Sequence, residues 1–264
     1  MPTFIDQLGR IISMPGIPER IISLVPSQTE LLHELGLERE TVGITKFCVR
    51  PAQWFRNKAR VGGTKDLKPD KIHALRPDLI FANKEENNRQ QIEELAQRYP
   101  VWISDVPHLS AALDMIGMVG QISGKAAAAG ELVRSISTRF DSLIPTPRPL
   151  RTAYFIWREP WMVAGGGTFI DDMLQRCGFD NVFGDHVRYP AVDPVSLSVK
   201  GCDLVLLSSE PYPFKDKHIK ELRQVIAGAE IRLADGEMFS WYGSRLLQAP
   251  DYFRQLMRDL RSCT

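Results

Sequence analysis

Short hydrophobic runs alternate along the chain with longer amphipathic segments. The strand-like runs of the first part are Ile21–Val25, Val42–Ile44, Leu79–Ala82 and Val101–Ile103. The segments between them, in which hydrophobic residues recur at helical spacing, are Glu30–Leu35, Lys68–Leu75 and Arg89–Tyr99. Strands that alternate with helices are typical of a parallel sheet, because each crossover helix returns the chain to the same end of the sheet.

The same pattern restarts after residue 150. Its expected strands are Ala153–Ile156, Leu204–Ser208 and Ile231–Ala234, and its expected helices are Phe169–Cys177, Lys217–Ile226 and Ser244–Leu260. The sequence therefore predicts an α/β protein with two Rossmann-like lobes, each with its own parallel sheet.

The segment between the two patterns, from Ser110 to Leu143, is helical in composition. Gly124 is expected to divide it into two helices, since glycine inside a helix costs about 1 kcal/mol. The second helix keeps its hydrophobic residues on one face, which is typical of a helix that packs against protein along its length. We therefore expect one long helix to join the lobes, with the N-terminal lobe at 1–108, connecting helices at 109–149 and the C-terminal lobe at 150–264.

Composition narrows the classes of function. The 264 residues are 44% hydrophobic and 25% charged, and the net charge of +1 gives no basic surface for nucleic acid. No hydrophobic run approaches the roughly 20 residues that cross a bilayer. The cysteines and histidines lack the spacing of a metal site, so we expect no metal site and no catalytic cofactor.

Two turns are candidates for ligand contact as well as for helix capping. After the first strand, Ser27 or Thr29 is expected to cap the following helix, and the same turn is at a position where α/β proteins often bind ligands. The run Gly165–Gly167 precedes a helix and could offer N–H groups to a phosphate. It lacks the spacing of nucleotide-binding motifs, so we interpret Thr168 there as a helix cap.

Four stretches in this order resemble one family: RIISLVPSQTELLHELGL, VGGTKDLKPDKIHALRPDLIFAN, GGGTFIDDMLQRCGFDNVFGD and DGEMFSWYGSRLLQAP. The resemblance is to the helical-backbone (class III) solute-binding proteins, which serve ABC importers of vitamin B12, ferric siderophores and haem. It implies a monomeric binding protein, not an enzyme, whose ligand lies in a cleft between the lobes. The implied ligand is a metal chelate or tetrapyrrole, with cobalamin or a ferric siderophore ahead of haem.

The expected ligand contacts come partly from the residues and partly from this resemblance. Side chains that follow predicted strands or fill aromatic-rich loops supply Arg50, Asn83, Lys84, Trp157, Arg158, Trp161, Tyr242 and Arg245. The resemblance implies contacts at Phe47, Met162, Tyr189, Met238, Phe239 and Trp241. Where cobalamin-binding members carry two tryptophans, this chain has Thr64 and Asn83, which favours a more polar ligand.

The resemblance also implies docking to the membrane subunits of an ABC importer through one acidic residue on each lobe. Asp70 lies at the first position, and Asp193 lies two residues from the second. A disulfide between Cys177 and Cys263 would need an oxidising compartment.

The family resemblance implies a periplasmic or cell-surface location. The first residues of this sequence do not have the pattern of a signal peptide, so a cytoplasmic location is the alternative. Two other functions stay open: a cytosolic carrier of corrinoids or metal chelates, and a metal-cluster enzyme subunit on the same fold.

Overall fold

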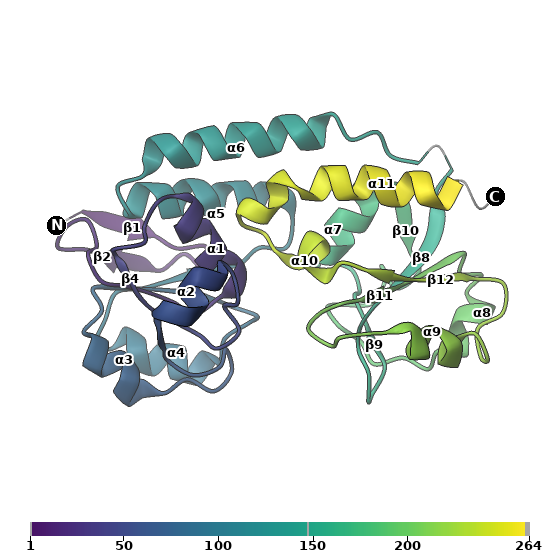
Figure 1. The fold of residues 1–264 in the computed structure, drawn as a ribbon, viewed down its shortest axis with the longest axis horizontal. Coiled ribbons are helices and arrows are strands. Elements are labelled where there is room, and N and C mark those ends of the chain that lie inside the picture. Colours follow the sequence, from purple (N-terminus) through teal and green to yellow (C-terminus); the bar gives the residue numbers. More distant parts are fainter. Residues whose placement is uncertain (1, 147, 262–264) are drawn as a thin grey trace. The chain divides into compact units, whose positions relative to one another are not determined.

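The computed structural model describes residues 2–146 and 148–261, which form two compact units (Figure 1). Unit 1 contains the residues up to Val106, together with Ser110–Ile136 and Tyr242–Arg245. Unit 2 contains Pro107–Leu109, Ser137–Trp241 and the residues from Leu246 onward. The chain therefore leaves unit 1 and returns to it more than once.

Unit 1 is built on a five-stranded parallel sheet with the order β5-β4-β3-β6-β7. Its strands are β3 (Ile21–Ser23), β4 (Thr41–Ile44), β5 (Ala59–Arg60), β6 (Leu79–Asn83) and β7 (Val101–Ser104). Its sheet is preceded by an antiparallel hairpin of β1 (Thr3–Ile5) and β2 (Ile11–Ser13), which the sequence analysis did not predict. The helices that follow the strands are α1 (Pro26–Glu34), α2 (Ala52–Asn57), α3 (Pro69–Leu75) and α4 (Arg89–Ala96).

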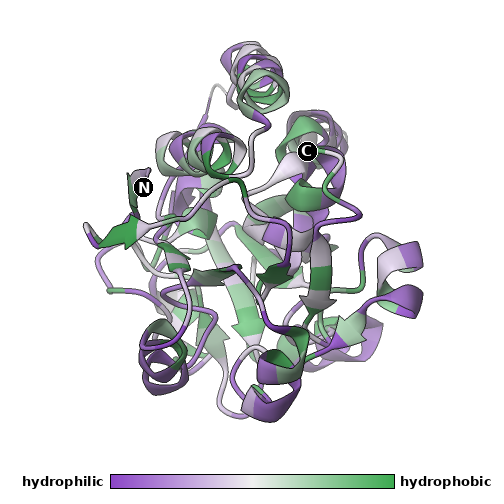
Figure 2. Cartoon of the chain, turned by 90° about the vertical axis from the view of Figure 1, so that its left-hand side faces the viewer, coloured by the Kyte–Doolittle hydropathy of each residue, from purple (hydrophilic) through white to green (hydrophobic). Residues whose placement is uncertain are grey.

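Burial explains why the central strands could be found from the sequence. Every residue of β3, β6 and β7 is buried, as expected for a parallel sheet that helices cover on both faces. Figure 2 shows hydrophobic residues in the strands and hydrophilic residues along the outer turns of the helices. The predicted parallel α/β architecture is confirmed.

Unit 2 has a second sheet with the order β10-β8-β11-β12, and these strands are all parallel. They are β8 (Leu150–Trp157), β10 (Phe179–Asn181), β11 (Leu204–Ser208) and β12 (Glu230–Ala234), while β9 (Met162–Val163) pairs antiparallel with β8. The helices are α7 (Phe169–Arg176), α8 (Ser196–Val199), α9 (Asp216–Leu222), α10 (Gly236–Ser240) and α11 (Ala249–Arg261).

The final helix differs from the prediction. The sequence pattern predicts one helix over Ser244–Leu260, but a 3₁₀ helix, η1 (Ser244–Leu247), comes before α11. Pro250 is the reason, because its missing N–H and its ring are compatible with the first turn of a helix but not with the interior.

Two helices occupy the segment in which Gly124 was expected to make a division. They are α5 (Leu109–Ile122) and α6 (Ala126–Asp141), and the boundary between the two units falls inside α6. Gly124 adopts a left-handed conformation with φ of 71°, which glycine accepts without strain. The predicted division at Gly124 is confirmed.

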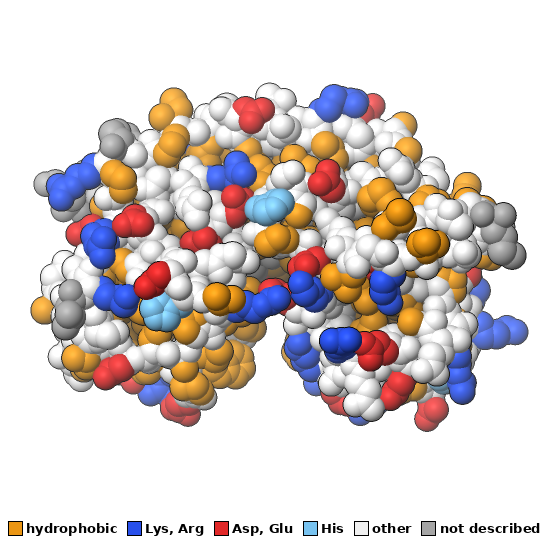
Figure 3. Space-filling model, turned by 180° about the vertical axis from the view of Figure 1, so that it is seen from behind, with side chains coloured by type: hydrophobic (Ala, Val, Ile, Leu, Met, Phe, Trp, Pro, Cys, Tyr) orange, Lys and Arg blue, Asp and Glu red, His pale blue; other side chains and the backbone are white. Residues whose placement is uncertain are grey.

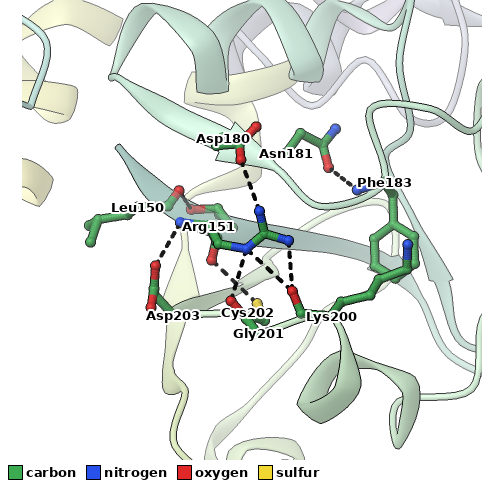
Figure 4. Close-up of polar contacts among 10 residues, drawn as sticks. Leu150, Arg151, Asp180, Asn181, Phe183, Lys200, Gly201, Cys202 and Asp203 are labelled. Atoms are coloured by element: carbon green, nitrogen blue, oxygen red, sulfur yellow. Dashed lines mark hydrogen bonds and ion pairs between the residues drawn. The ribbon is translucent and has the colours of Figure 1, made fainter. Parts of the chain in front are cut away.

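Arg151 ties together the amino ends of the strands of unit 2 (Figure 4). Its guanidinium donates to the carbonyl oxygens of Lys200 (2.7 Å) and Gly201 (3.0 Å), and it reaches the carboxylate of Asp180 at 3.4 Å. Its backbone N–H donates to the carboxylate of Asp203 at 2.9 Å. The polar groups at this edge of the sheet therefore bind one another.

Charges of both signs are interspersed over the face shown in Figure 3, as the net charge of +1 suggests. Over residues 2–146 and 148–261, none of the helices combines the length and the hydrophobicity that a membrane crossing requires.

The glycine run before α7 brings two stretches of backbone into direct contact. The N–H groups of Gly165 and Gly166 donate to the carbonyl oxygens of Arg188 (2.6 Å) and His186 (2.7 Å). A Cβ atom on Gly166 would lie 2.1 Å from the carbonyl oxygen of Gly184. These two N–H groups are already bonded within the chain, so they are not available to a phosphate.

Thr168 caps the helix that follows this run. Its hydroxyl oxygen accepts a hydrogen bond from the N–H of Asp171 at 3.2 Å, and the capping role predicted for Thr168 is confirmed.

Gly166→Ala should lower the free energy of unfolding by about 1–3 kcal/mol, because the added methyl group collides with backbone. The control is Gly117→Ala in α5, where the added methyl group meets no atom within 4 Å. This control should raise stability by about 0.5–1 kcal/mol, since alanine favours the helix. Urea denaturation followed by circular dichroism measures both, and a Gly166→Ala protein as stable as the wild type would contradict the close contact.

Candidate functional site

The strand order of unit 2 places a topological switch point between β8 and β11. The chain adds β10 on one side of β8 and then β11 and β12 on the other side, so the direction in which the sheet grows reverses at this point. The loops after β8 and β11 leave the same edge of the sheet on either side of this point. Ligands of open α/β sheets bind in the crevice that such loops leave.

Four rings line this edge, and we call Trp157, Trp161, Tyr212 and Phe214 the aromatic wall. Trp157 lies against Tyr212 with ring centroids 5.7 Å apart, and Tyr212 lies 4.8 Å from Phe214. Phe214 stacks on Trp161 at 5.9 Å with nearly parallel planes. The contacts join the ring at the end of β8 and a ring from the loop after it to rings from the loop after β11.

The aromatic wall keeps ring surface accessible to a ligand. Trp157 is 40% exposed, Trp161 and Tyr212 are half-buried, and Phe214 is buried behind them. Large rings that stay partly exposed beside a crevice are typical of surfaces that bind flat apolar groups.

His218 supports the wall from within unit 2. Its ring is buried, and its Nε2 lies 3.2 Å from the hydroxyl oxygen of Tyr212. Burial, with the nearby charges of Lys217 and Arg158, lowers the pKa of His218. The side chain is therefore neutral at neutral pH.

Arg158 was expected to complement an anionic ligand. Its guanidinium lies over the ring of Trp161 at 5.4 Å and donates to Glu221 at 2.8 Å and to Glu159. Carboxylates of the chain therefore already balance the charge of Arg158.

Met162 and Tyr189, the other contacts expected near this edge, are both half-buried. Met162 lies in β9, where it pairs with Trp157.

The loop after β12 places its rings differently from the expectation. Phe239 is completely buried, and its ring centroid lies 5.0 Å from that of Tyr154 and 4.8 Å from that of Phe253. It therefore fills the core of unit 2. Trp241 is also buried and donates its indole N–H to Glu210 at 2.7 Å.

Glu210, the acceptor of this bond, is half-buried in the loop after β11. Burial raises its pKa, and the hydrogen bonds from Ser240 and Trp241 act in the opposite direction. Met238, next to the buried Phe239, stays half-buried.

Tyr242 and Arg245 belong to unit 1 and are held by acidic residues of that unit. Tyr242 donates its hydroxyl hydrogen to Glu86, and the buried Arg245 forms an ion pair with the half-buried Glu30. Because its hydroxyl is engaged with a carboxylate, Tyr242 is a poor candidate for a ligand to iron. The positive charge of Arg245 is compensated inside the unit.

Unit 1 has its own switch point, between β3 and β6, and polar side chains fill it. We call Gln28, Asn83, Asn87 and Ser104 the amide network. Gln28 donates to the hydroxyl of Ser104 at 2.6 Å, and the Asn83 amide nitrogen donates to the same residue at 3.0 Å. Asn87 donates to the carbonyl oxygen of Leu24 at 3.2 Å.

Asn83, an expected ligand contact, forms all its hydrogen bonds within the chain. Its amide oxygen accepts from the N–H groups of Glu85 and Glu86, at 2.8 and 3.0 Å. Its amide nitrogen donates to the carbonyl oxygen and the hydroxyl of Ser104. All its hydrogen-bonding capacity is satisfied, which assigns Asn83 to the fold.

Three expected contacts of unit 1 remain on the surface. Phe47 is 50% exposed with the ammonium of Lys46 over its ring, and Arg50 is exposed in the same loop. Lys84 is exposed and pairs with Asp105 at 2.6 Å.

The turn after β3 starts α1 without the expected cap. The helix begins at Pro26, and Thr29 donates its hydroxyl hydrogen to the carbonyl oxygen of Val25 at 2.9 Å. The capping prediction for Ser27 and Thr29 is wrong, because proline supplies the first helical residue and has no N–H to satisfy.

The described cysteines are buried and protonated. Burial raises the pKa of Cys48 and of Cys202 to about 11, and it also raises that of Cys177. Cys263, the expected partner of Cys177, lies outside the described residues. Within the described ranges, no three His, Cys, Asp or Glu side chains converge as metal ligands.

The two acidic residues expected to dock to a transporter are both exposed. Asp70 lies in the first turn of α3, and Asp193 accepts the N–H of Val195 at 3.0 Å just before α8.

Known proteins share this fold and part of this sequence. A vitamin B12-binding protein of Yersinia pestis is 26% identical over 207 residues, which cover 75% of this chain and 74% of the relative. The periplasmic vitamin B12-binding protein of Vibrio cholerae superposes with a TM-score of 0.75 at 22% identity and covers 94% of this chain and 99% of its own. A periplasmic haem-binding protein of Roseiflexus sp. RS-1 superposes with a TM-score of 0.77 at 22% identity over 90% and 99% of the two chains.

The match to a family covers most of the chain. Residues 21–225 match the family described as periplasmic binding protein, and this range includes β3, the whole aromatic wall and α9. The chain is a member of the periplasmic binding protein family.

Proposed function

We propose that this chain is the substrate-binding protein of an ABC importer and that it binds a metal chelate or tetrapyrrole without changing it chemically. Cobalamin or a ferric siderophore is the leading ligand, and haem follows. The observation that carries the proposal is the aromatic wall, because partly exposed rings line the switch point of a parallel sheet in a periplasmic binding protein. Curated and solved relatives named for binding vitamin B12 and haem support the class of ligand.

The proposed contacts are those expected side chains that remain accessible. The accessible contacts in unit 2 are Trp157, Arg158, Trp161, Met162, Tyr189 and Met238, and those at the carboxyl edge of unit 1 are Phe47, Arg50 and Lys84. Four of the expected contacts are buried, and we propose that they support the fold and do not contact the ligand. They are Phe239, Trp241, Tyr242 and Arg245.

A periplasmic or cell-surface location goes with this function. Fractionation of the native host, with the protein detected by antibody, should find it outside the cytoplasmic fraction.

Ultraviolet–visible titration with hydroxocobalamin, haemin and a ferric catecholate complex tests the ligand class. At least one probe should change its spectrum on binding, and Trp157→Ala should weaken that binding about tenfold because a stacking face is lost. Trp157→Phe is the matched control, since it keeps a ring and should keep most of the affinity. If none of the three probes changes its spectrum or stabilises the protein against heat, the proposed function is contradicted.

Docking to the transporter is proposed through Asp70 and Asp193. Asp70→Asn and Asp193→Asn keep the shape of each side chain and remove its charge, so cellular uptake of the bound probe should fall several-fold. The affinity of the purified protein for that probe should stay unchanged. Glu93→Gln, an exposed change on α4, is the control, and full uptake by the double variant would contradict docking at these positions.

A further inference from the structure

We propose that Tyr212 selects the ligand by donating its phenolic hydrogen to an oxygen acceptor at the rim of a flat chelate, and that His218 is the positioning residue that fixes this donor. The inference rests on the proposed function and names the chemistry of that site. Neither residue was among the contacts expected from the sequence.

Two hydrogen bonds determine which nitrogen of His218 carries the proton. The backbone N–H of Lys215 donates to Nδ1 at 2.9 Å, so Nδ1 presents its lone pair. In a neutral imidazole the hydrogen then resides on Nε2, which lies 3.2 Å from the hydroxyl oxygen of Tyr212. His218 is therefore the donor in this bond, and the Tyr212 oxygen is the acceptor.

This direction leaves the hydrogen of the Tyr212 hydroxyl available. Among the residues that the structure describes, no acceptor takes it. Tyr212 is half-buried beside Trp157, which is 40% exposed, so part of its side chain lies at the accessible face of the aromatic wall. A polar hydrogen in such a place costs affinity when a ligand covers it without accepting it.

The ring of Tyr212 is held on several sides. Trp157 lies at 5.7 Å with its plane inclined by 71°, and Phe214 lies at 4.8 Å inclined by 60°. The buried ring of His218 touches both Tyr212 and Phe214, at 5.4 and 5.3 Å. The hydroxyl group therefore has one position, and the donor is in place before the ligand arrives.

This combination recognises a defined class of ligand. The ring faces accept a flat conjugated body, and the fixed donor requires an oxygen at its edge, from an amide or a carboxylate group. Sites built to bond a ligand oxygen discriminate strongly against analogues that lack it, because the site's own polar group is then left unpaired. Tyr212 thus contributes specificity, while the rings contribute area.

Two probes test the inference: hydroxocobalamin, which carries amide groups at its rim, and haemin, which carries carboxylates. Quenching of tryptophan fluorescence measures the binding of each probe. Tyr212→Phe keeps the ring and should lower the affinity for the probe about three- to tenfold, as expected for one lost hydrogen bond. Tyr99→Phe is the matched control, since Tyr99 also pairs with a histidine, His73, at 2.9 Å but lies in unit 1. It should bind like the wild type.

Two changes at His218 separate positioning from simple stability. In His218→Asn the amide oxygen can still accept from Lys215, but the donor to Tyr212 is lost, so affinity should fall as in Tyr212→Phe. The effect should vanish when Tyr212 is already phenylalanine, because the histidine acts through the hydroxyl. In His218→Gln the amide can reach Tyr212 as a donor, and this variant should recover affinity.

Nitrogen NMR of the wild-type protein reads the tautomer without any substitution, and a proton on Nδ1 of His218 would overturn the inference. If the wild type binds a probe and Tyr212→Phe binds it equally well, the inference fails and the proposed function stands. If the wild type binds neither probe nor the ferric catecholate complex, the proposed function fails and the inference fails with it.

Discussion

The parallel pairing of β8 with β11 is the constraint on which the aromatic wall depends. The two strands run side by side from the pair Thr152 and Leu204 to the pair Phe155 and Leu207. Since both strands point the same way, their carboxyl ends meet at one edge, and rings from two distant loops come within contact. A shift in this register would separate Trp157 from Tyr212 and dismantle the wall, even if every loop kept its sequence.

Each unit has a parallel sheet with a switch point, but the two units use this point in different ways. In unit 1 the amide network occupies this position, and the bonds of Asn83 close it with groups of the chain itself. In unit 2 rings occupy the same topological position and keep exposed area. The fold therefore offers a place for a ligand twice, and the loop residues decide whether that place is filled by the protein or left for a partner molecule.

Sequence patterns predicted the strands that are buried on both faces, because a run such as Leu79–Ala82 has few other interpretations. Short strands such as β9 and β10 carry too few residues to show a period. At the site, Trp157 and Trp161 were found because they follow a strand. Tyr212 was missed because its role comes from contacts that local sequence does not encode. Phe239 lies in an equally aromatic stretch, and only the packing of distant helices against it shows that it belongs to the core.

The wall also explains how exposed rings can stay ordered in water. Two of the accessible rings rest on buried ones: Trp161 on Phe214 and Phe155, and Tyr212 on Phe214 and His218. Trp157, the most exposed ring, rests in turn on Tyr212. Rings that are already immobile lose little conformational entropy when a ligand covers them, so more of the burial energy appears as affinity. The same contacts make the wall selective, because a rigid donor such as the Tyr212 hydroxyl cannot move away from a ligand that offers it no acceptor. In the proposed function, rigidity rather than the number of rings would make this edge of the sheet a recognition surface.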